Sequence, residues 1–292
     1  MKRLHLFELM DQAWWPDRFK KMETDYLGAA NRLIGFYRPA VSTLGRAMRH
    51  VGCRRIVDLC SGSGTHLEPI LAQIEAEQKM VCGATLTDIA PHADTYTEIG
   101  RRNARFGHVN TPVDARDVPG HLHGFRTLFA GFHHFSPDHA RRILKNAFET
   151  GTGIAVVEHT RRSPFGILSM LFTPILVWAL TPFIRPFRFS RLFWTYVVPV
   201  VPFAILWDGI VSAFRSYTEP ELRAMVAPLA SPDYQWGFET FRVGGLVATT
   251  LLIGYPAASR IVEQDATEKA AETRPAFAME PSFTRQRLPH AT

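Results

Sequence analysis

Two glycines and an aspartate stand close together in the segment VDLCSGSGTH, residues 57–66. Gly62 and Gly64 allow the backbone to bend sharply and let a ligand approach the peptide groups. The helix expected after them offers free N–H groups and the positive end of its dipole. Asp58 precedes the glycines, where its carboxylate would repel a pyrophosphate, so the segment favours a ligand that carries a positive charge. An ordinary turn between a strand and a helix explains the two glycines equally well.

Two further acids follow at the ends of predicted strands. Asp88 lies about twenty residues beyond the glycines, where a carboxylate can accept hydrogen bonds from both hydroxyls of a ribose. Asp114 and Ala115 end the next predicted strand, where the carboxylate can accept from an adenine amino group and the backbone N–H can donate to the ring. Three acids at successive strand ends would face the crevice in which open α/β sheets bind ligands.

Strands and helices alternate between residues 54 and 158, which predicts a doubly wound, parallel α/β sheet. Ser136 and Pro137 are expected to start one of the helices, and Thr218 with Glu221 fits a capping box. The expected strands are RRIVDLC (54–60), KMVCGATLTD (79–88), HVNTPVDA (108–115), GFRTLFAG (124–131) and TGIAVVEHT (152–160), followed by two closing strands in 233–241 and 244–256.

Together these motifs resemble the class I S-adenosylmethionine-dependent methyltransferase family, and in particular a bacterial group with a hydrophobic insert. The resemblance covers about residues 54–158 and 217–256. It implies a Rossmann-like sheet of seven strands, mostly parallel, with an antiparallel terminal hairpin. It also implies S-adenosylmethionine as the cofactor and methyl transfer as the reaction, to an O, N or C nucleophile of a hydrophobic small molecule or lipid.

The resemblance also assigns the cofactor-binding residues. Asp58, Gly62 and Gly64 would hold the methionine end, with Cys60 and Ser61 standing where the family often has glycine. The remaining candidates are Asp88 for the ribose, Asp114 and Ala115 for the adenine, and their neighbours Ile89 and Phe132. Two other functions stay open: a cofactor-binding membrane adaptor without turnover, and an NAD-type oxidoreductase. Asp58 and the absence of a third glycine at Leu67 count against the oxidoreductase.

The catalytic candidates are His134, His133 and Glu158, which follow the fourth and fifth predicted strands. A neutral imidazole can take a proton from a substrate near neutral pH, and Glu158 can orient a histidine or a substrate. The alternatives are that one histidine packs against the next helix while the other faces solvent, and that Glu158 pairs with Arg161 or Arg162. Because a sulfonium methyl is already activated, alignment and exclusion of water suffice without a base.

Residues 161–216 form a predicted helical insert that contains two uncharged stretches, 165–184 and 192–207. The first has a marginal length for a membrane span, and the second is too short. A helical hairpin on the cytoplasmic leaflet is favoured, with aromatics at the interface and Arg185, Arg188 and Arg191 at lipid phosphates. A soluble lid over the active site and a true span are the alternatives.

The rest of the chain divides into an N-terminal helical cap (1–50), the core (51–160 and 217–256) and a disordered tail (257–292). Trp14, Trp15 and Tyr26 are expected either to close over the ligand or to pack together in the core. The net charge of +6 without a run of basic residues gives no indication of nucleic acid. Three cysteines without a CxxC motif indicate a reducing compartment and no metal site. A cytoplasmic enzyme, peripheral on the inner face of the membrane, is therefore expected.

Overall fold

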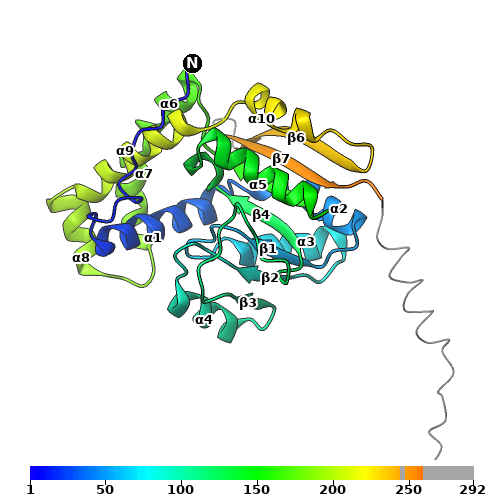
Figure 1. Cartoon of the computed structure of the whole chain (residues 1–292). Coiled ribbons are helices and arrows are strands. Elements are labelled where there is room, and N and C mark those ends of the chain that lie inside the picture. Colours follow the sequence, from blue (N-terminus) through cyan, green and yellow to red (C-terminus); the bar gives the residue numbers. More distant parts are fainter. Residues whose placement is uncertain (244–246, 259–292) are drawn as a thin grey trace, which may run out of the picture. The chain divides into compact units, whose positions relative to one another are not determined.

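A computed structural model of the chain describes residues 1–243 and 247–258, and these residues contain one seven-stranded sheet. Strands β1 to β5 run parallel, β7 runs antiparallel to β5, and β6 runs antiparallel to β7, in the order β3-β2-β1-β4-β5-β7-β6 (Figure 1). The predicted Rossmann-like sheet with its antiparallel closing hairpin is confirmed. The strands are β1 (Arg55–Asp58), β2 (Gly83–Leu86), β3 (Phe106–His108), β4 (Phe125–Phe129), β5 (Ile154–Glu158), β6 (Tyr234–Val243) and β7 (Val247–Pro256).

Helices cover both faces of this sheet. Because successive side chains of a strand point to opposite faces, Ile56 and Val57 of β1 enter two different hydrophobic clusters. One cluster includes residues of α2 (Arg38–His50), α3 (Leu67–Gln78) and α4 (Ala93–Arg102); the other includes residues of α5 (Pro137–Glu149) and α10 (Glu219–Val226). Helix α2 was expected in the N-terminal cap, but its apolar side chains pack with the sheet. The predicted caps are present, with Ser136 at the start of α5 and the Thr218–Glu221 capping box at α10.

The prediction of the third strand was wrong: β3 shares only His108 with the predicted 108–115. It ends at His108, so Asp114 and Ala115 lie in the loop beyond it and not at its end. Pro112 has no N–H to donate to a neighbouring strand, which disfavours continuation of the ladder. The loop nevertheless stays beside β2, because Val109 donates its N–H to the carbonyl of Leu86 at 3.0 Å.

The insert forms a separate helical group with α1 (Asp17–Ile34), which Figure 1 shows to one side of the sheet. A third hydrophobic cluster joins α1 to these helices. The helical stretch Pro164–Phe183 is long and apolar enough to cross a membrane, and a second candidate is the pair Phe189–Val197 and Val200–Arg215, bent by 73°. The insert helices are α6 (Pro164–Met170), α7 (Thr173–Leu180), α8 (Phe189–Leu192) and α9 (Val200–Arg215). Apart from residues 257 and 258, the predicted tail lies outside the described residues.

Candidate functional site

Asp58 lies at the carboxyl end of β1, where the strand order reverses between β1 and β4. Its side chain is only 1% exposed. One carboxylate oxygen accepts a hydrogen bond of 2.6 Å from Thr127 Oγ1, and the other lies 3.3 Å from His66 Nε2. Thr127 thus fixes one oxygen of the carboxylate, whereas Asp58 Oδ2 and His66 Nε2 make no hydrogen bond within the described residues. Sequence reasoning missed both neighbours. This reversal point is where open α/β sheets bind ligands.

The glycine loop takes backbone conformations that favour glycine. Gly64 has a φ of +69°, and a Cβ there would lie 2.8 Å from Leu86 Cδ1. Gly62 has a φ of +53°, and a Cβ there would meet no atom within 4 Å. Gly64 is therefore needed for packing against β2, whereas the Cα of Gly62 faces open space. Cys60 also has a positive φ, 58°, which explains why glycine suits this position in similar loops.

Asp88 is tied directly to the glycine loop. One of its carboxylate oxygens accepts from the N–H of Gly62 at 2.9 Å, and the other accepts from the N–H of Ala90 at 3.0 Å. The hydroxyl of Tyr96 donates to the carbonyl of Gly62 at 2.9 Å, so both polar backbone groups of Gly62 are held by side chains. A carboxylate has about four lone-pair positions, so Asp88 keeps acceptor capacity for hydroxyl donors. The adjacent Ile89 is exposed.

The loop of Asp114 joins this edge through its backbone, because Val113 donates its N–H to the carbonyl of Asp88 at 2.8 Å. The Asp114 carboxylate accepts from Arg116 Nε at 2.8 Å and lies 2.5 Å from Arg116 Nη2. These hydrogen bonds from Arg116 hold the pKa of Asp114 below its usual value. A ligand amino group would therefore have to share this carboxylate with Arg116.

The charges of all three acids affect the pKa of the Cys60 thiol in the glycine loop. Burial is the main cause that raises the pKa of this thiol, and the negative charges of Asp88, Asp58 and Asp114 raise it further. Hydrogen bonds join the three loops that carry these acids, and their contact with one ligand stays a prediction.

The other predicted cofactor residues lie around the same loop. Ser61 is buried, and its hydroxyl donates to the backbone carbonyl of Asp58 at 2.9 Å. Ala115 and Phe132 belong to one hydrophobic cluster, and Cys60 packs against it. These positions place apolar surface next to the acids.

A short 3-10 turn, η1 (Phe132–His134), follows β4 and carries both catalytic candidates. A Cβ added to the preceding Gly131 would lie 3.4 Å from Cys60 Cβ, so the turn begins beside the glycine loop. Glu158, at the end of β5, accepts from the N–H groups of Phe132 and His133 at 2.7 and 3.1 Å. Its second oxygen lies 2.8 Å from His133 Nδ1.

Glu158 thus holds His133 and its backbone, whereas Arg162 pairs with Glu221. Burial by itself would raise the pKa of Glu158, but the adjacent His133 lowers it below its usual value. The carboxylate is therefore suited to fix the orientation of the imidazole.

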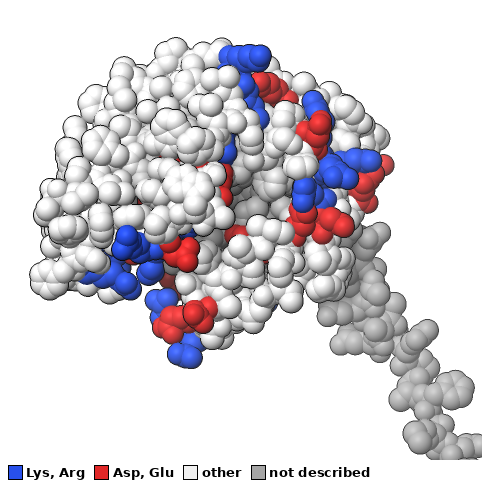
Figure 2. Space-filling view, turned by 60° about the vertical axis from the view of Figure 1, so that its left-hand side comes forward, with Lys and Arg blue, Asp and Glu red and all other residues white. Residues whose placement is uncertain are grey.

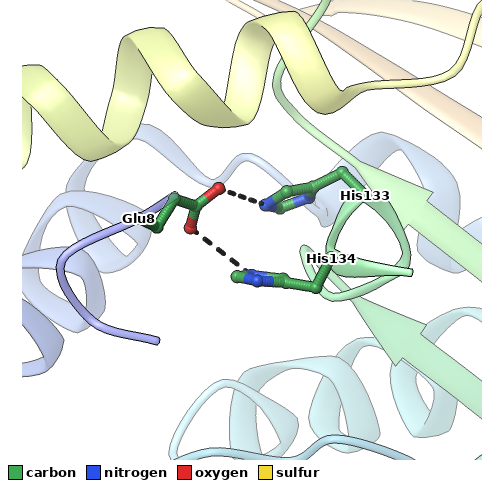
Figure 3. A group of neighbouring side chains, drawn as sticks. All are labelled: Glu8, His133 and His134. Carbon is green, nitrogen blue, oxygen red and sulfur yellow. Dashed lines mark ion pairs between the residues drawn. The ribbon is translucent and has the colours of Figure 1, made fainter. Parts of the chain in front are cut away.

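The N-terminal segment adds residues that sequence reasoning missed. The carboxylate of Glu8 faces both imidazoles, with 3.6 Å from Oε1 to His133 Nε2 and 3.7 Å from Oε2 to His134 Nε2 (Figure 3). Asp11 lies 3.1 Å from His134 Nδ1 and 2.7 Å from Arg215. Burial lowers the pKa of His134, but the hydrogen bond to Asp11 and the negative charges of Glu8 and Asp11 together outweigh it, and the net shift is upward. No local signal reveals these contacts, because their partners are far apart in the sequence.

The three aromatic candidates of the N-terminal region have different environments. Trp14 is 65% exposed. Trp15 and Tyr26 take part in the cluster between α1 and the insert, and Trp15 Nε1 donates to Glu23 at 2.7 Å. Packing accounts for Trp15 and Tyr26, while Trp14 is available to a partner.

Comparison with known proteins finds no matching family model and no matching curated protein. Among solved structures, the chain is similar to the mitomycin 7-O-methyltransferase MmcR, with 15% identity, a TM-score of 0.44, and coverage of 76% of this chain and 54% of that one. It is also similar to the plantazolicin methyltransferase BpumL in complex with SAH, with 12% identity, a TM-score of 0.46, and coverage of 82% and 98%. For human N-acetylserotonin methyltransferase in complex with SAM, the identity is 14%, the TM-score 0.46, and the coverage 81% and 55%. The chain thus spans about half the length of the mitomycin and human enzymes.

Proposed function

We propose that the protein transfers the methyl group of S-adenosylmethionine to an O, N or C nucleophile of a hydrophobic small molecule or lipid. The observation that carries this proposal is that hydrogen bonds join the loops of Asp58, Asp88 and Asp114 at the reversal point of the sheet: Asp88 accepts from the N–H of Gly62, and Val113 donates its N–H to the carbonyl of Asp88. The open space at Gly62 supports it, because a ligand can approach the Cα there without displacing a side chain.

The residues at this edge suit the parts of the cofactor. Asp88 keeps lone pairs for two ribose hydroxyls after its bonds to Gly62 and Ala90. The buried charge of Asp58 favours a cationic ligand end next to Gly62 and Gly64. When bound, the cofactor supplies an activated sulfonium methyl, and the protein contributes binding, alignment and exclusion of water.

On the acceptor side, we assign proton acceptance to the histidine turn. His134 is the more accessible of the two, with 33% of its side chain exposed against 4% for His133. His133 and Glu158 support it by fixing the turn. Typical contributions of such general-base groups are on the order of 10²–10⁴-fold in rate.

An apolar groove supports a hydrophobic acceptor. It has a volume of about 690 Å³ and is lined by Leu9, Trp15 and residues between 198 and 210. Leu9 directly follows Glu8, which faces the histidine turn. An acceptor with an apolar body and a polar end fits this arrangement, because the body would leave water while the polar end stays near the imidazoles.

The surface of the insert supports peripheral membrane contact. Large apolar side chains point outward, including Phe183 at 76% and Phe189 at 80% exposure. Figure 2 shows the face that carries the insert as mostly uncharged. Exposed apolar patches of this kind mark membrane or protein contacts.

Two arginines on this surface are available for lipid phosphates. Arg185 and Arg188 are exposed. The assignment of Arg191 to lipid was wrong: it is buried and pairs with Asp25 at 2.5 Å, because a guanidinium inside the protein needs a fixed partner. We propose that the insert rests on the cytoplasmic leaflet.

Calorimetric titration with S-adenosylhomocysteine tests the cofactor site. Asp88→Asn should weaken binding about tenfold or more, the scale of a lost charge-assisted hydrogen bond of about 1.5 kcal/mol. The exposed Asp94 provides the matched control, and Asp94→Asn should bind like the wild type. Equal affinity in both variants would refute the ribose assignment. In a separate assay, methyl incorporation from labelled cofactor into lipid extracts would distinguish an enzyme from a non-catalytic adaptor.

Flotation with vesicles of phosphatidylglycerol tests the membrane contact. Protein that carries both Phe183→Glu and Phe189→Glu should no longer float with the vesicles. The control variant Val81→Glu, which changes an exposed apolar residue before β2, should still float. Vesicles of neutral phosphatidylcholine should retain less protein if Arg185 and Arg188 contribute. Wild-type protein that never floats would remove the membrane proposal without touching the methyltransferase proposal.

A further inference from the structure

We propose that Glu8, His133 and His134 bind a divalent transition-metal ion. Figure 3 shows the carboxylate of Glu8 facing the edges of the two imidazoles, with one oxygen toward each ring. The cysteine pattern had indicated no metal site, and spacing gives no sign of this one because Glu8 lies far from the histidines in the sequence.

The donor atoms are close to the separation that a metal requires. The three possible ligand atoms lie within 4.8 Å of one another, and the two distances from Glu8 oxygens to Nε2 atoms are 3.6 and 3.7 Å. Nitrogen and oxygen ligands about 2.0–2.1 Å from a tetrahedral ion stand roughly 3.4 Å apart. Small side-chain rotations would therefore close the site.

The second ring nitrogen of each histidine is already held by a carboxylate. His133 Nδ1 lies 2.8 Å from Glu158, and His134 Nδ1 lies 3.1 Å from Asp11. Metal-binding histidines typically donate their other N–H to a carboxylate or carbonyl, which fixes the tautomer and turns the free nitrogen toward the ion. For His133 this arrangement leaves Nε2 as the ligand. Arg215 also lies 3.3 Å from Nδ1 of His134, and in both residues Nε2 is the atom that faces Glu8.

The surrounding charge favours a dication. With neutral imidazoles, the carboxylates of Glu8, Asp11 and Glu158 meet one guanidinium, that of Arg215, which contacts both Glu8 and Asp11. This leaves two negative charges in a largely buried cluster. One divalent ion would balance them, and buried charges need such compensation.

The donor set indicates the class of metal. Two imidazole nitrogens and one carboxylate suit zinc and its neighbours, whereas magnesium and calcium prefer oxygen ligands. Three protein ligands leave one position open for water or for an oxygen-bearing ligand. The ion would also join the N-terminal segment to the turn after β4. Because it would occupy Nε2 of His134, the proton acceptance proposed above for His134 applies to the metal-free protein.

The test is zinc binding to the full chain after treatment with a chelator, measured by calorimetry and by metal analysis. We expect one zinc per chain. Glu8→Gln and His134→Ala should each lower the affinity more than about 100-fold, and Glu158→Gln, which alters an outer partner, about 10–100-fold. His121→Ala, an exposed histidine in a loop, should bind like the wild type.

Cobalt provides a second readout, because its visible absorption reports tetrahedral coordination by the protein. Circular dichroism of each variant shows whether the fold is kept, and Glu8→Gln is the mildest change because it preserves the shape of the side chain. Unchanged zinc affinity in Glu8→Gln and His134→Ala, or no zinc bound by the wild type, would overturn the site. No methyl donor is present in these measurements, so failure here and failure of the proposed methyl transfer are distinguishable.

Discussion

Aromatic side chains of the sheet and of the insert lie in opposite environments. Phe125 of β4 is completely buried, whereas Phe189 of α8 is 80% exposed. Strand β4 lies between helical layers on both faces, but the outer surface of the insert has no second layer within the part of the chain that the structure describes. Hydrophobic composition alone therefore does not show whether a segment is buried. A segment is buried within the protein only where another layer of helices or strands packs against it.

The largest expected effect separates these two environments. Phe125→Ala should lower the free energy of unfolding by about 3–5 kcal/mol, because it removes a fully buried ring. Phe189→Ala should change it by less than about 0.5 kcal/mol. Urea unfolding of both variants measures the contrast, and similar losses in the two would mean that the insert surface is covered in solution.

Beneath the insert, buried carboxylates should make stability depend on pH. Burial raises the pKa of Glu23 in α1 and of Asp208 in α9. Acids with a raised pKa in the folded state bind protons more tightly there than in the unfolded chain. Their contribution to the free energy of unfolding therefore falls as the pH rises from about 5 to 8. Glu23→Gln should make this decline less steep, and at pH 8 its free energy of unfolding should exceed that of the wild type by on the order of 2 kcal/mol. Thermal unfolding at pH 5.5 and 8 tests it, and an unchanged pH slope in the variant would contradict the assignment.

The glycine loop gives a comparison within the core. Gly64→Ala should cost about 1–2 kcal/mol, since it combines a positive φ with a contact of 2.8 Å to Leu86. Gly62→Ala should cost less in stability, because nothing lies within 4 Å of the added carbon. It should instead weaken S-adenosylhomocysteine binding by filling the open space. If Gly62→Ala lowered stability more than Gly64→Ala and left S-adenosylhomocysteine binding unchanged, the open space at Gly62 would not be a ligand site.

The smallest expected effect concerns Ala130, which follows β4 with a φ of 50°. Glycine takes this conformation without steric strain, so Ala130→Gly should stabilise the protein by less than about 1 kcal/mol. Differential scanning calorimetry would detect the higher unfolding temperature. A lower temperature would mean that the packing of the methyl group outweighs the strain.

The sequence was sufficient to predict the sheet, because strand and helix patterns alternate regularly there. The capping residues Ser136 and Thr218 start α5 and α10 as predicted, since caps depend on local hydrogen bonds. The end of the third strand was wrong, because Pro112 and the exposed residues beside it disrupt the ladder. The meeting of the loops that carry Asp58, Asp88 and Asp114 followed from the strand order alone.

The contacts of the N-terminal segment and the insert were not predictable in the same way. The partners of Glu8 and Asp11 belong to η1 and α9, and such contacts depend on how separate units pack. The burial of Arg191 likewise follows from the placement of α1, which supplies Asp25. Charge patterns along the chain contain no information on these pairings.

Several of the first residues of the chain find partners near residue 210. Leu9 and Met10 donate their N–H groups to Asp208, and Arg215 Nε donates to the carbonyl of Leu6 at 2.7 Å. At about 5–20 residues per second, a ribosome needs roughly 10–40 s to add those intervening 200 or so residues. During translation, the N-terminal segment therefore stays without these partners until α9 has emerged from the exit tunnel. Only then can α9 help to hold Glu8 and Asp11 against the histidine turn.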